Sequence, residues 1–355
     1  MNVSNPPSVA LISEFPPPAA GMTVLAEEFY ERLKKINYPI IKIRTNPDLG
    51  KYSWLNNIRV VRSVVKWMIF FVDCFKIKNT DIIHIFSSSG LNFFLFTIPP
   101  IILANLFSKR IIINYHGGAA YDFFSKHQKI LAFAMKRINK LVVPSGYLKS
   151  VFDEFGYDSM VISNIANVKR FTYRKRIKLE PVVLSVRNLT SVYNIQCAVR
   201  AFHILKTKYP HAKMYIAGDG PEMNNIQDLI SELKLTDVEL LGNISNDQVP
   251  VYFNLADIFI NTSNIDNMPG SILEAFSSGL PVVSTNVGGI PYMVKHNESG
   301  LLADPNDHGT LGKYLIQMVE YPEKSLNMSE AGYSYVLGLK WSKIKNDWLH
   351  LYNEL

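Results

Sequence analysis

The chain has 355 residues, which is long enough for two domains of ordinary size. Hydrophobic residues make up 48% of it and charged residues 19%, which excludes an intrinsically disordered protein. The two cysteines, Cys74 and Cys197, lie in separate apolar segments, so we expect neither a disulfide framework nor a cysteine metal site. This cysteine usage fits a reducing compartment, and we expect a cytoplasmic protein.

The formal net charge of +7 is unevenly distributed along the chain. Residues 1–170 carry 21 Lys and Arg against 11 Asp and Glu, a balance of +10, and the remainder carries 16 against 19, a balance of −3. A basic half predicts an anionic partner, such as a membrane surface or a phosphorylated substrate. Because no nucleic-acid-binding motif accompanies this charge, we do not expect nucleic acid as a partner.

Two segments were tested for targeting or membrane insertion. The first 15 residues have no basic region before an apolar run, so a signal peptide is not predicted. Residues 82–108 contain no Asp, Glu, Lys or Arg, but residues 87–90 (SSSG) and 99–100 (PP) interrupt the apolar pattern. A spanning helix needs ~20 continuous apolar residues, so a buried strand followed by an apolar helix is the better interpretation.

Short apolar runs alternate with helical patterns through the first half of the chain. The predicted strands are residues 8–15, 39–44, 82–86, 110–115, 140–144 and 161–164. The predicted helices are residues 22–35, 59–76, 92–107, 128–139 and 146–155. Because parallel strands need crossover helices, this alternation predicts an α/β domain with a doubly wound parallel sheet over residues 1–166.

The same alternation restarts after a polar, basic segment, residues 167–180, which we interpret as a linker. The predicted strands are residues 182–186, 213–217, 238–241, 256–260 and 280–285. The predicted helices are residues 194–208, 224–233, 247–255, 271–278 and 309–320. We therefore expect a second Rossmann-like domain over residues 181–340, followed by an aromatic-rich helix at residues 341–355.

The stretch from residue 261 to 289 combines the features of a ligand site. It follows a predicted strand, so it lies at the carboxyl edge of the sheet, where open α/β sheets bind ligands. A helix that begins near Pro269 or Gly270 offers free backbone N–H groups to a phosphate. Two carboxylates eight residues apart, Asp266 and Glu274, can accept hydrogen bonds from sugar hydroxyls. This stretch alone leaves open that both carboxylates only stabilise the helix start.

Several short motifs follow one another in a specific order over residues 182–305. They are GDGP at residues 218–221, LG at 241–242, LEA at 273–275, GLPVV at 279–283, GGIP at 288–291 and SGLL at 299–302. With these motifs the chain resembles the family-4 glycosyltransferases of the GT-B fold. The resemblance implies two Rossmann-like doubly wound domains that face each other across a cleft. It also implies that the helix at residues 341–355 completes the N-terminal domain.

The resemblance implies that a sugar is transferred, with retention, from a nucleoside-diphosphate sugar to an acceptor hydroxyl, without a metal ion or other cofactor. We expect a glycan or glycolipid acceptor in cell-envelope polysaccharide or glycolipid assembly. The basic, apolar segment 59–76 and the apolar segment 93–107 could rest on the anionic inner face of a membrane. That these segments are ordinary core helices is left open.

The resemblance also implies roles for individual residues. Arg187 corresponds to the arginine that binds the diphosphate, and an arginine fork suits phosphate oxygens. Glu274 would accept hydrogen bonds from the ribose hydroxyls, Asp266 would contact the transferred sugar, and His116 corresponds to the active-site histidine. The other implied donor-binding residues are Gly21, Gly220, Asn243, Asn267, Pro269, Gly270 and Ser271. For Gly220 and its neighbour Gly218, a purely turn-shaping role is an open alternative.

Two departures from the family pattern leave other functions open. Tyr193 and Asn194 stand where the family has Lys-Gly, and Asp266 stands where it has a glutamate. The missing lysine favours, as an alternative, a non-catalytic nucleotide-sugar-binding subunit. A nucleotide-sugar epimerase would share the fold and the donor. An NAD-dependent dehydrogenase is discounted, because prolines at residues 16–18, not a glycine-rich turn, follow the first strand.

Overall fold

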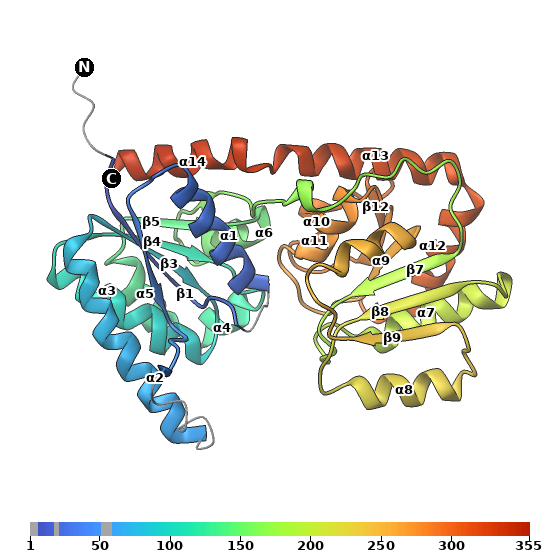
Figure 1. Cartoon of the computed structure of the whole chain (residues 1–355), viewed down its shortest axis with the longest axis horizontal. Helices are drawn as coiled ribbons and strands as arrows, with labels where there is room; N and C mark the ends of the chain where they lie inside the picture. Colours follow the sequence, from blue (N-terminus) through green and yellow to red (C-terminus); the bar gives the residue numbers. More distant parts are fainter. Residues whose placement is uncertain (1–5, 18–20, 51–58) are drawn as a thin grey trace. The chain divides into compact units, whose positions relative to one another are not determined.

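The computed structural model describes residues 6–17, 21–50 and 59–355. These residues form two compact units, the first within Met1–Ile165 together with Ile344–Leu355, and the second within Ala166–Lys343. Each unit is a parallel β-sheet flanked by helices (Figure 1), so the predicted α/β class with two doubly wound domains is confirmed. Part of the predicted loop after the first strand, residues 18–20, lies outside the described residues.

The first unit follows the predicted alternation closely. Its strands are β1 (Val9–Ser13), β2 (Ile40–Arg44), β3 (Ile82–Ser87), β4 (Arg110–Tyr115), β5 (Lys140–Val143) and β6 (Met160–Val161). Its α-helices are α1 (Gly21–Lys35), α2 (Arg59–Cys74), α3 (Ile98–Leu106), α4 (Ala120–Lys126), α5 (Gln128–Met135), α6 (Gly146–Glu154) and α14 (Trp341–Glu354). Of these, α4 was not predicted. The short helices η2 (Phe75–Asn79) and η3 (Phe93–Thr97) complete this unit.

In the described residues the first sheet has the strand order β2-β1-β3-β4-β5-β6, and each neighbouring pair is parallel. The residues of β1 and β3 are all buried, which explains their continuous apolar sequences, VALIS and IIHIFS. The chain leaves β1 toward β2 on one side, and β3 lies on the other side. The point between β1 and β3 is therefore the topological switch point, where ligands bind in open sheets.

The predicted helix at residues 92–107 is divided into the π-helical turn η3 and helix α3. Pro99 and Pro100 lie in the first turn of α3, where a missing N–H is tolerated. Pro99 cannot donate to the carbonyl of Leu95, four residues earlier. The indole Nε1 of Trp67 donates to that carbonyl instead, at 3.2 Å, and so connects α2 to η3.

The last helix, α14, packs against the first unit through aromatic contacts. The hydroxyl of Tyr352 lies 2.6 Å from Nδ1 of the fully buried His84. The indole of Trp348 stacks on the same imidazole, with ring centroids 4.5 Å apart, and contacts Phe29. Residues from Ile344 onward therefore share the hydrophobic core of the first unit.

The second unit also follows the predicted order. Its strands are β7 (Val182–Val186), β8 (Lys213–Ala217), β9 (Val238–Gly242), β10 (Ile258–Asn261), β11 (Val282–Thr285) and β12 (Gly300–Ala303). Its helices are η4 (Val168–Arg170), α7 (Ile195–Lys208), α8 (Met223–Glu232), α9 (Val249–Leu255), α10 (Gly270–Ser277), α11 (Ile290–Met293), α12 (His308–Glu320) and α13 (Pro322–Gly338). Of these, β12, η4, α11 and α13 were not predicted.

Within the described residues the second sheet has the order β12-β11-β10-β7-β8-β9, again with parallel neighbours. From β7 the chain proceeds through β8 to β9 on one side, and then crosses to β10, β11 and β12 on the other. The switch point therefore lies between β7 and β10. The loops that follow these two strands contain Arg187 and Asp266.

The segment at residues 167–180, interpreted from its polarity as a linker, is packed against the second unit. Arg176 is 5% exposed, and its Nε donates to Asp257 at 2.8 Å. Its terminal nitrogens donate to the main-chain carbonyls of Ala256, Ser278 and Gly279. Arg176 of this segment therefore belongs to a buried ion pair. A polar sequence alone does not show whether its charged side chains are buried in ion pairs or exposed to solvent.

Within residues 6–17, 21–50 and 59–355, no helix is both long enough and apolar enough to cross a membrane. Cys74 and Cys197 are both buried, and neither forms a disulfide.

Candidate functional site

Arg187 is the first residue after β7, so it lies at the switch point of the second unit. Its guanidinium forms an ion pair with the Asp266 carboxylate, and both side chains are nearly buried, at 12% and 13% exposure. Its Nε donates to Oδ1 of Asn261, the last residue of β10, at 3.1 Å. Burial lowers the pKa of Arg187 to about 10, with opposing effects from Tyr193 and Glu274, so the guanidinium stays charged at neutral pH.

A network of short polar side chains fixes this ion pair. The Nδ2 of Asn261 donates to Ser284 on β11 at 3.0 Å. The hydroxyl of Ser263 lies 3.0 Å from Oδ1 of Asn261 and 3.1 Å from Oδ2 of Asp266. These contacts hold Asp266 and Arg187 at the carboxyl edge of the sheet. Asn261, at the end of β10, and Asp266, in the loop after it, thus orient the Arg187 guanidinium.

Helix α10 begins next to this network and directs its N-terminus to the same edge. Pro269 is its N-cap, in an extended conformation, and Gly270 is exposed. The hydroxyl of Ser271 is buried and has no hydrogen-bond partner among the described residues. Free N–H groups, the positive end of the helix dipole and an unpaired hydroxyl together form an environment for an anion.

Glu274 lies one turn into α10 and faces two arginines. Its Oε1 is 3.7 Å from the guanidinium of Arg170, and both side chains are partly buried. Burial raises the pKa of Glu274 to about 7, although Arg170 and then Arg187 act to lower it. The protonation state of this carboxyl therefore responds to pH close to neutrality.

Tyr193 and Asn194, which replace the family's Lys-Gly, are both integrated into this site. The ring of Tyr193 lies under the Arg187 guanidinium, 4.5 Å from it. Asn194 has a left-handed backbone with φ of 47°, a conformation that glycine and asparagine tolerate best. The Thr262 hydroxyl donates to the carbonyls of both residues, at 3.1 and 2.9 Å. Asn194 therefore has a backbone conformation that glycine also adopts, and Tyr193 places an aromatic ring beside Arg187.

The glycines of the 218–221 turn allow the close approach of two backbone segments. A Cβ on Gly218 would lie 1.8 Å from the carbonyl oxygen of Arg187, and one on Gly220 would lie 2.3 Å from that of Leu189. Their φ values of 143° and 159° are ones that side chains rarely adopt. These contacts explain why glycines are needed here, and they place the turn against the loop that begins with Arg187.

Two other predicted donor-binding residues of this unit lie around the same edge. Asn243 is exposed directly after β9. Asn267 is buried, its N–H donates to Oδ1 of Asp266 at 3.0 Å, and its carbonyl contacts the backbone of Gly289 closely. The second unit therefore brings Arg187, Asp266 and the start of α10 together, with Glu274 next to them.

Sequence reasoning did not identify Arg170 as a member of this site, and it assigned no individual role to Asn261 or Ser263 within the predicted stretch 261–289. Arg170 lies in the segment interpreted as a linker, so its charge was assigned to solvent. Asn261 and Ser263 directly follow a buried strand, and polar side chains at that position are the signal that would have found them.

Two predicted residues lie in the first unit. His116 follows β4, and its ring stacks on Phe86 with centroids 5.1 Å apart. Burial lowers the pKa of His116 to about 3, so the imidazole is neutral at pH 7, and its Nε2 is buried without a partner among the described residues. Gly21 is the exposed first residue of α1, and a Cβ there would meet no described atom within 4 Å.

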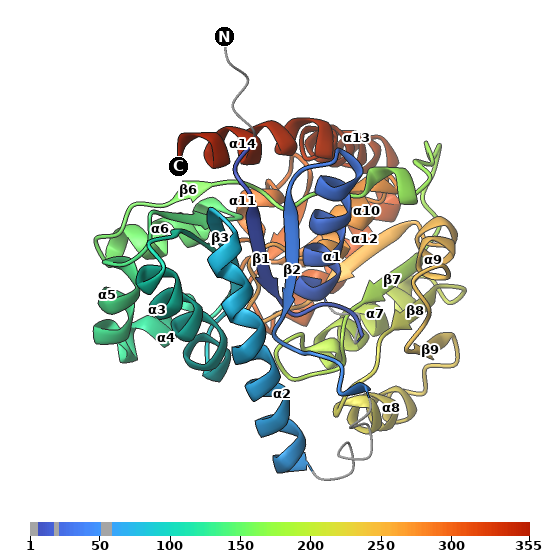
Figure 2. The same cartoon turned by 60° about the vertical axis from the view of Figure 1, so that its left-hand side comes forward.

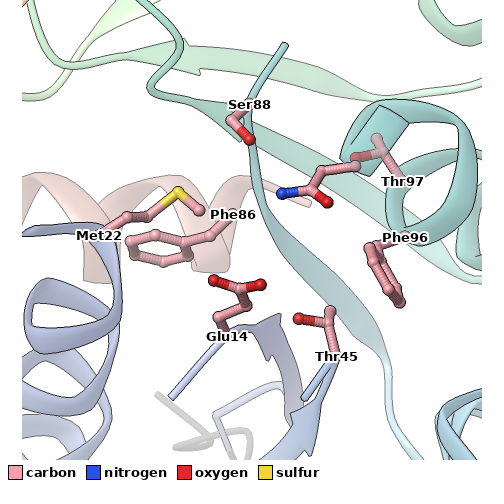
Figure 3. A pocket seen from close by; sticks show the side chains of 8 residues that line it. Glu14, Met22, Thr45, Phe86, Ser88, Phe96 and Thr97 are labelled. Carbon is pink, nitrogen blue, oxygen red and sulfur yellow. The ribbon is translucent and has the colours of Figure 1, made fainter. Parts of the chain in front are cut away.

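A small, partly open pocket lies at the switch point of the first sheet. Figure 3 shows the carboxylate of Glu14, which follows β1, directed into this pocket beside Phe86 and Thr45. The other residues that line it are Met22, Ser88, Asn92, Phe96 and Thr97. Phe86 therefore has the pocket on one side and the ring of His116 stacked against it.

No cluster of three or more His, Cys, Asp or Glu residues that could hold a metal ion occurs within residues 6–17, 21–50 and 59–355.

Comparison with known proteins finds similarity to glycosyltransferases. Residues 168–335, which make up most of the second unit, match the family model described as glycosyl transferases group 1. An uncharacterized glycosyltransferase of Haemophilus influenzae is 28% identical over 236 residues, covering 64% of this chain and 65% of that protein. The N-acetyl-alpha-D-glucosaminyl L-malate synthase of Bacillus anthracis is 31% identical over 152 residues, covering 42% and 39%. The chain thus spans less than two thirds of these curated relatives.

Solved structures match over nearly the whole chain. Anabaena HepE in complex with UDP superposes with a TM-score of 0.77 at 16% identity, covering 98% of this chain and 100% of that one. Sucrose-phosphate synthase from Thermosynechococcus elongatus gives a TM-score of 0.79 at 18% identity, covering 98% of both chains. These similarities confirm the predicted GT-B fold.

Proposed function

We propose that this protein is a retaining glycosyltransferase that moves a sugar from a nucleoside-diphosphate sugar to an acceptor hydroxyl. The observation that carries the proposal is the grouping of Arg187, Asp266 and Glu274 with the start of α10. This grouping lies at a switch point, in a segment that matches glycosyl transferases group 1. HepE, a structural neighbour, was crystallised with UDP and with UDP-glucose, which supports a nucleotide-sugar donor.

The chemistry that the site must support is the departure of a nucleoside diphosphate. Negative charge develops on the leaving phosphate, and preorganised donors aimed at that charge lower the barrier. The Arg187 guanidinium, the first N–H groups of α10 and the Ser271 hydroxyl are such donors. We assign the phosphates to these groups, and propose that they make a metal ion unnecessary.

The two carboxylates are assigned to hydroxyl groups of the donor. Glu274 accepts hydrogen bonds from the ribose, and Asp266 contacts the transferred sugar. Because Asp266 is paired with Arg187, the arriving diphosphate competes with Asp266 for the guanidinium. Release of Asp266 then makes its carboxylate available to the sugar. Asn243, Asn267 and Gly220 would border the nucleotide.

We propose that the first unit binds the acceptor and supplies side chains that contact the reacting groups. Its pocket offers Glu14 and the hydroxyl of Thr45 to a glycan, and His116 and Gly21 are assigned to the donor sugar and the phosphates. Because the Nε2 of His116 is buried, its contact with a sugar requires local movement. The pathway that we propose is cell-envelope polysaccharide or glycolipid assembly, at the cytoplasmic face of a membrane.

The proposal is tested by incubating the full chain with UDP-, GDP- and ADP-sugars and lipid-linked acceptors. NMR of the product would identify the transferred sugar and its anomeric configuration. An α-linked product from an α-linked donor, lost in Glu274→Gln, is the expected result. An isomerised nucleotide sugar formed without acceptor would identify an epimerase, and donor that binds without being consumed would identify a non-catalytic subunit.

The pH dependence of donor affinity tests the role of Glu274. If the ribose hydroxyls donate to its carboxylate, binding favours the ionised form, and affinity rises as pH rises through about 7. Between pH 6 and pH 8 the ionised fraction grows from about 10% to about 90%, so we expect roughly ninefold tighter binding. Calorimetric titration with a nucleotide sugar is suitable, because its phosphate diesters do not titrate in this range. Affinity that stays constant, or that changes equally in Glu274→Gln, would refute this role.

The substitution Tyr193→Lys tests the meaning of the missing lysine. A lysine here would add a second cation next to Arg187, and we expect about tenfold tighter binding of UDP or the cognate diphosphate. Tyr193→Phe keeps the ring under Arg187 and is the matched control, with affinity expected to stay unchanged. Transfer that is absent in the natural chain but present in Tyr193→Lys would favour the non-catalytic alternative.

A further inference from the structure

Helix α2 of the first unit presents a row of apolar side chains to solvent. Val60, Val64, Met68 and Val72 recur every four residues, and Phe75 follows in the next turn. These five residues are 49–75% exposed. Figures 1 and 2 both show α2 extending outward from its unit at its N-terminal end. The four-residue spacing places these side chains along one side of the helix.

A neighbouring side of α2 packs within the first unit. Phe70 and Cys74 are completely buried, and Trp67 donates to the carbonyl of Leu95. The rings of Trp67 and Phe71 stack with centroids 5.5 Å apart. The inner face therefore accounts for the attachment of α2 to its unit. It does not account for the exposed row, which an ordinary core helix would not retain.

Positive charge accompanies the exposed row. Residues 59–79 contain five Lys or Arg and one acidic residue, Asp73, which gives a balance of +4. Asp73 is itself paired with Lys76 at 2.6 Å. Apolar side chains together with an excess of cations match the surface of a bilayer that contains anionic lipids. They match a neutral or basic protein surface poorly.

The adjacent helix α3 extends this apolar surface. Ile102 and Leu106, four residues apart, are 50% and 72% exposed. The rings of Phe75 and Phe107 lie 6.3 Å apart, which joins the end of α2 to the end of α3. Both helix ends therefore expose aliphatic side chains close to one another in the first unit.

We infer that α2 is the element through which this protein lies on an anionic lipid bilayer. Val64, Met68 and Val72 enter the interface, and the lysines of residues 60–79 contact lipid headgroups. The inference deepens the proposed function, because it assigns the membrane contact of a transferase with a lipid-linked acceptor to one helix face. Its test is nevertheless independent of catalysis.

The test is flotation of the full chain with phosphatidylcholine vesicles that contain or lack phosphatidylglycerol, at low and high salt. We expect binding that needs the anionic lipid and weakens with salt. The triple variant Val64→Ser, Met68→Ser and Val72→Ser should partition roughly tenfold less or weaker still. The control replaces three exposed apolar residues of the second unit, Ile177, Val251 and Leu255, with serine and should bind like the natural chain.

Other outcomes would overturn the inference. Equal partition of both triple variants would exclude α2 as the membrane contact. The natural chain could instead form a dimer and fail to bind vesicles. If the triple variant Val64→Ser, Met68→Ser and Val72→Ser dissociates that dimer, the exposed row contacts a second copy of this chain. Vesicle binding without any binding of nucleotide sugars would leave this inference standing and refute the proposed function instead.

Discussion

Arg187→Ala is expected to weaken the binding of a nucleoside-diphosphate sugar by roughly 100-fold and to abolish transfer. The guanidinium is the buried cation at the β7–β10 switch point, and it would form charge-assisted hydrogen bonds with the diphosphate. Loss of two such bonds costs about 3 kcal/mol, which corresponds to that factor in Kd. Calorimetric titration with the donor measures the change directly.

Two further variants separate this effect from a loss of structure. Because Arg187→Ala leaves Asp266 without its cation, the double variant Arg187→Ala with Asp266→Asn removes both charges and should fold while still failing to bind. Asp266→Asn alone should bind the free nucleoside diphosphate at least as well as the natural chain, since it releases Arg187, yet it should lose transfer. Arg200→Ala, on α7 and outside the network, is the matched arginine control. Normal donor affinity in Arg187→Ala would remove Arg187 from the site.

Asp257→Ala is expected to destabilise the second unit by about 3–5 kcal/mol. Asp257 accepts hydrogen bonds from Arg174, from Nε of Arg176 at 2.8 Å and from the N–H of Glu180 at 2.9 Å. Arg176 would remain as a buried cation without a counter-charge, because its side chain is 2% exposed. The midpoint of urea unfolding, followed by circular dichroism, measures the loss.

The double variant Asp257→Ala with Arg176→Met is expected to recover much of that stability, because it removes the buried cation along with its partner. The control is Asp158→Ala, whose side chain is 97% exposed and pairs with Lys149 at 3.2 Å, and no measurable change is expected. An Asp257→Ala midpoint as high as that of Asp158→Ala would show that the ion pair contributes little to the stability of the second unit.

The repeating pattern of the chain made the architecture predictable. Fully buried parallel strands such as β1 and β3 have continuous apolar sequences, and the helices between them have apolar residues at helical spacing. The elements that were missed have weaker signals. Helix α13 has a sequence with little apolar periodicity, and α11 has only four residues.

The candidate site could be predicted only in part, because its members come from distant segments. Arg187 and Asp266 each follow a strand, so their position at the sheet edge could be expected, but their ion pair depends on the adjacency of β7 and β10. Arg170 and Arg176 could not be told apart from solvated charges, because their partners, Glu274 and Asp257, lie about 100 and 80 residues away.

The most direct test of the central claim is the thermal stabilisation of the full chain by a panel of UDP-, GDP-, ADP- and CMP-sugars, measured in parallel for the natural chain and for Arg187→Ala. Binding to the folded state raises the apparent Tm. We predict that donors with one base raise the Tm of the natural chain and leave that of Arg187→Ala unchanged. A panel that shifts neither protein, or shifts both equally, would contradict a nucleotide-sugar site built around Arg187.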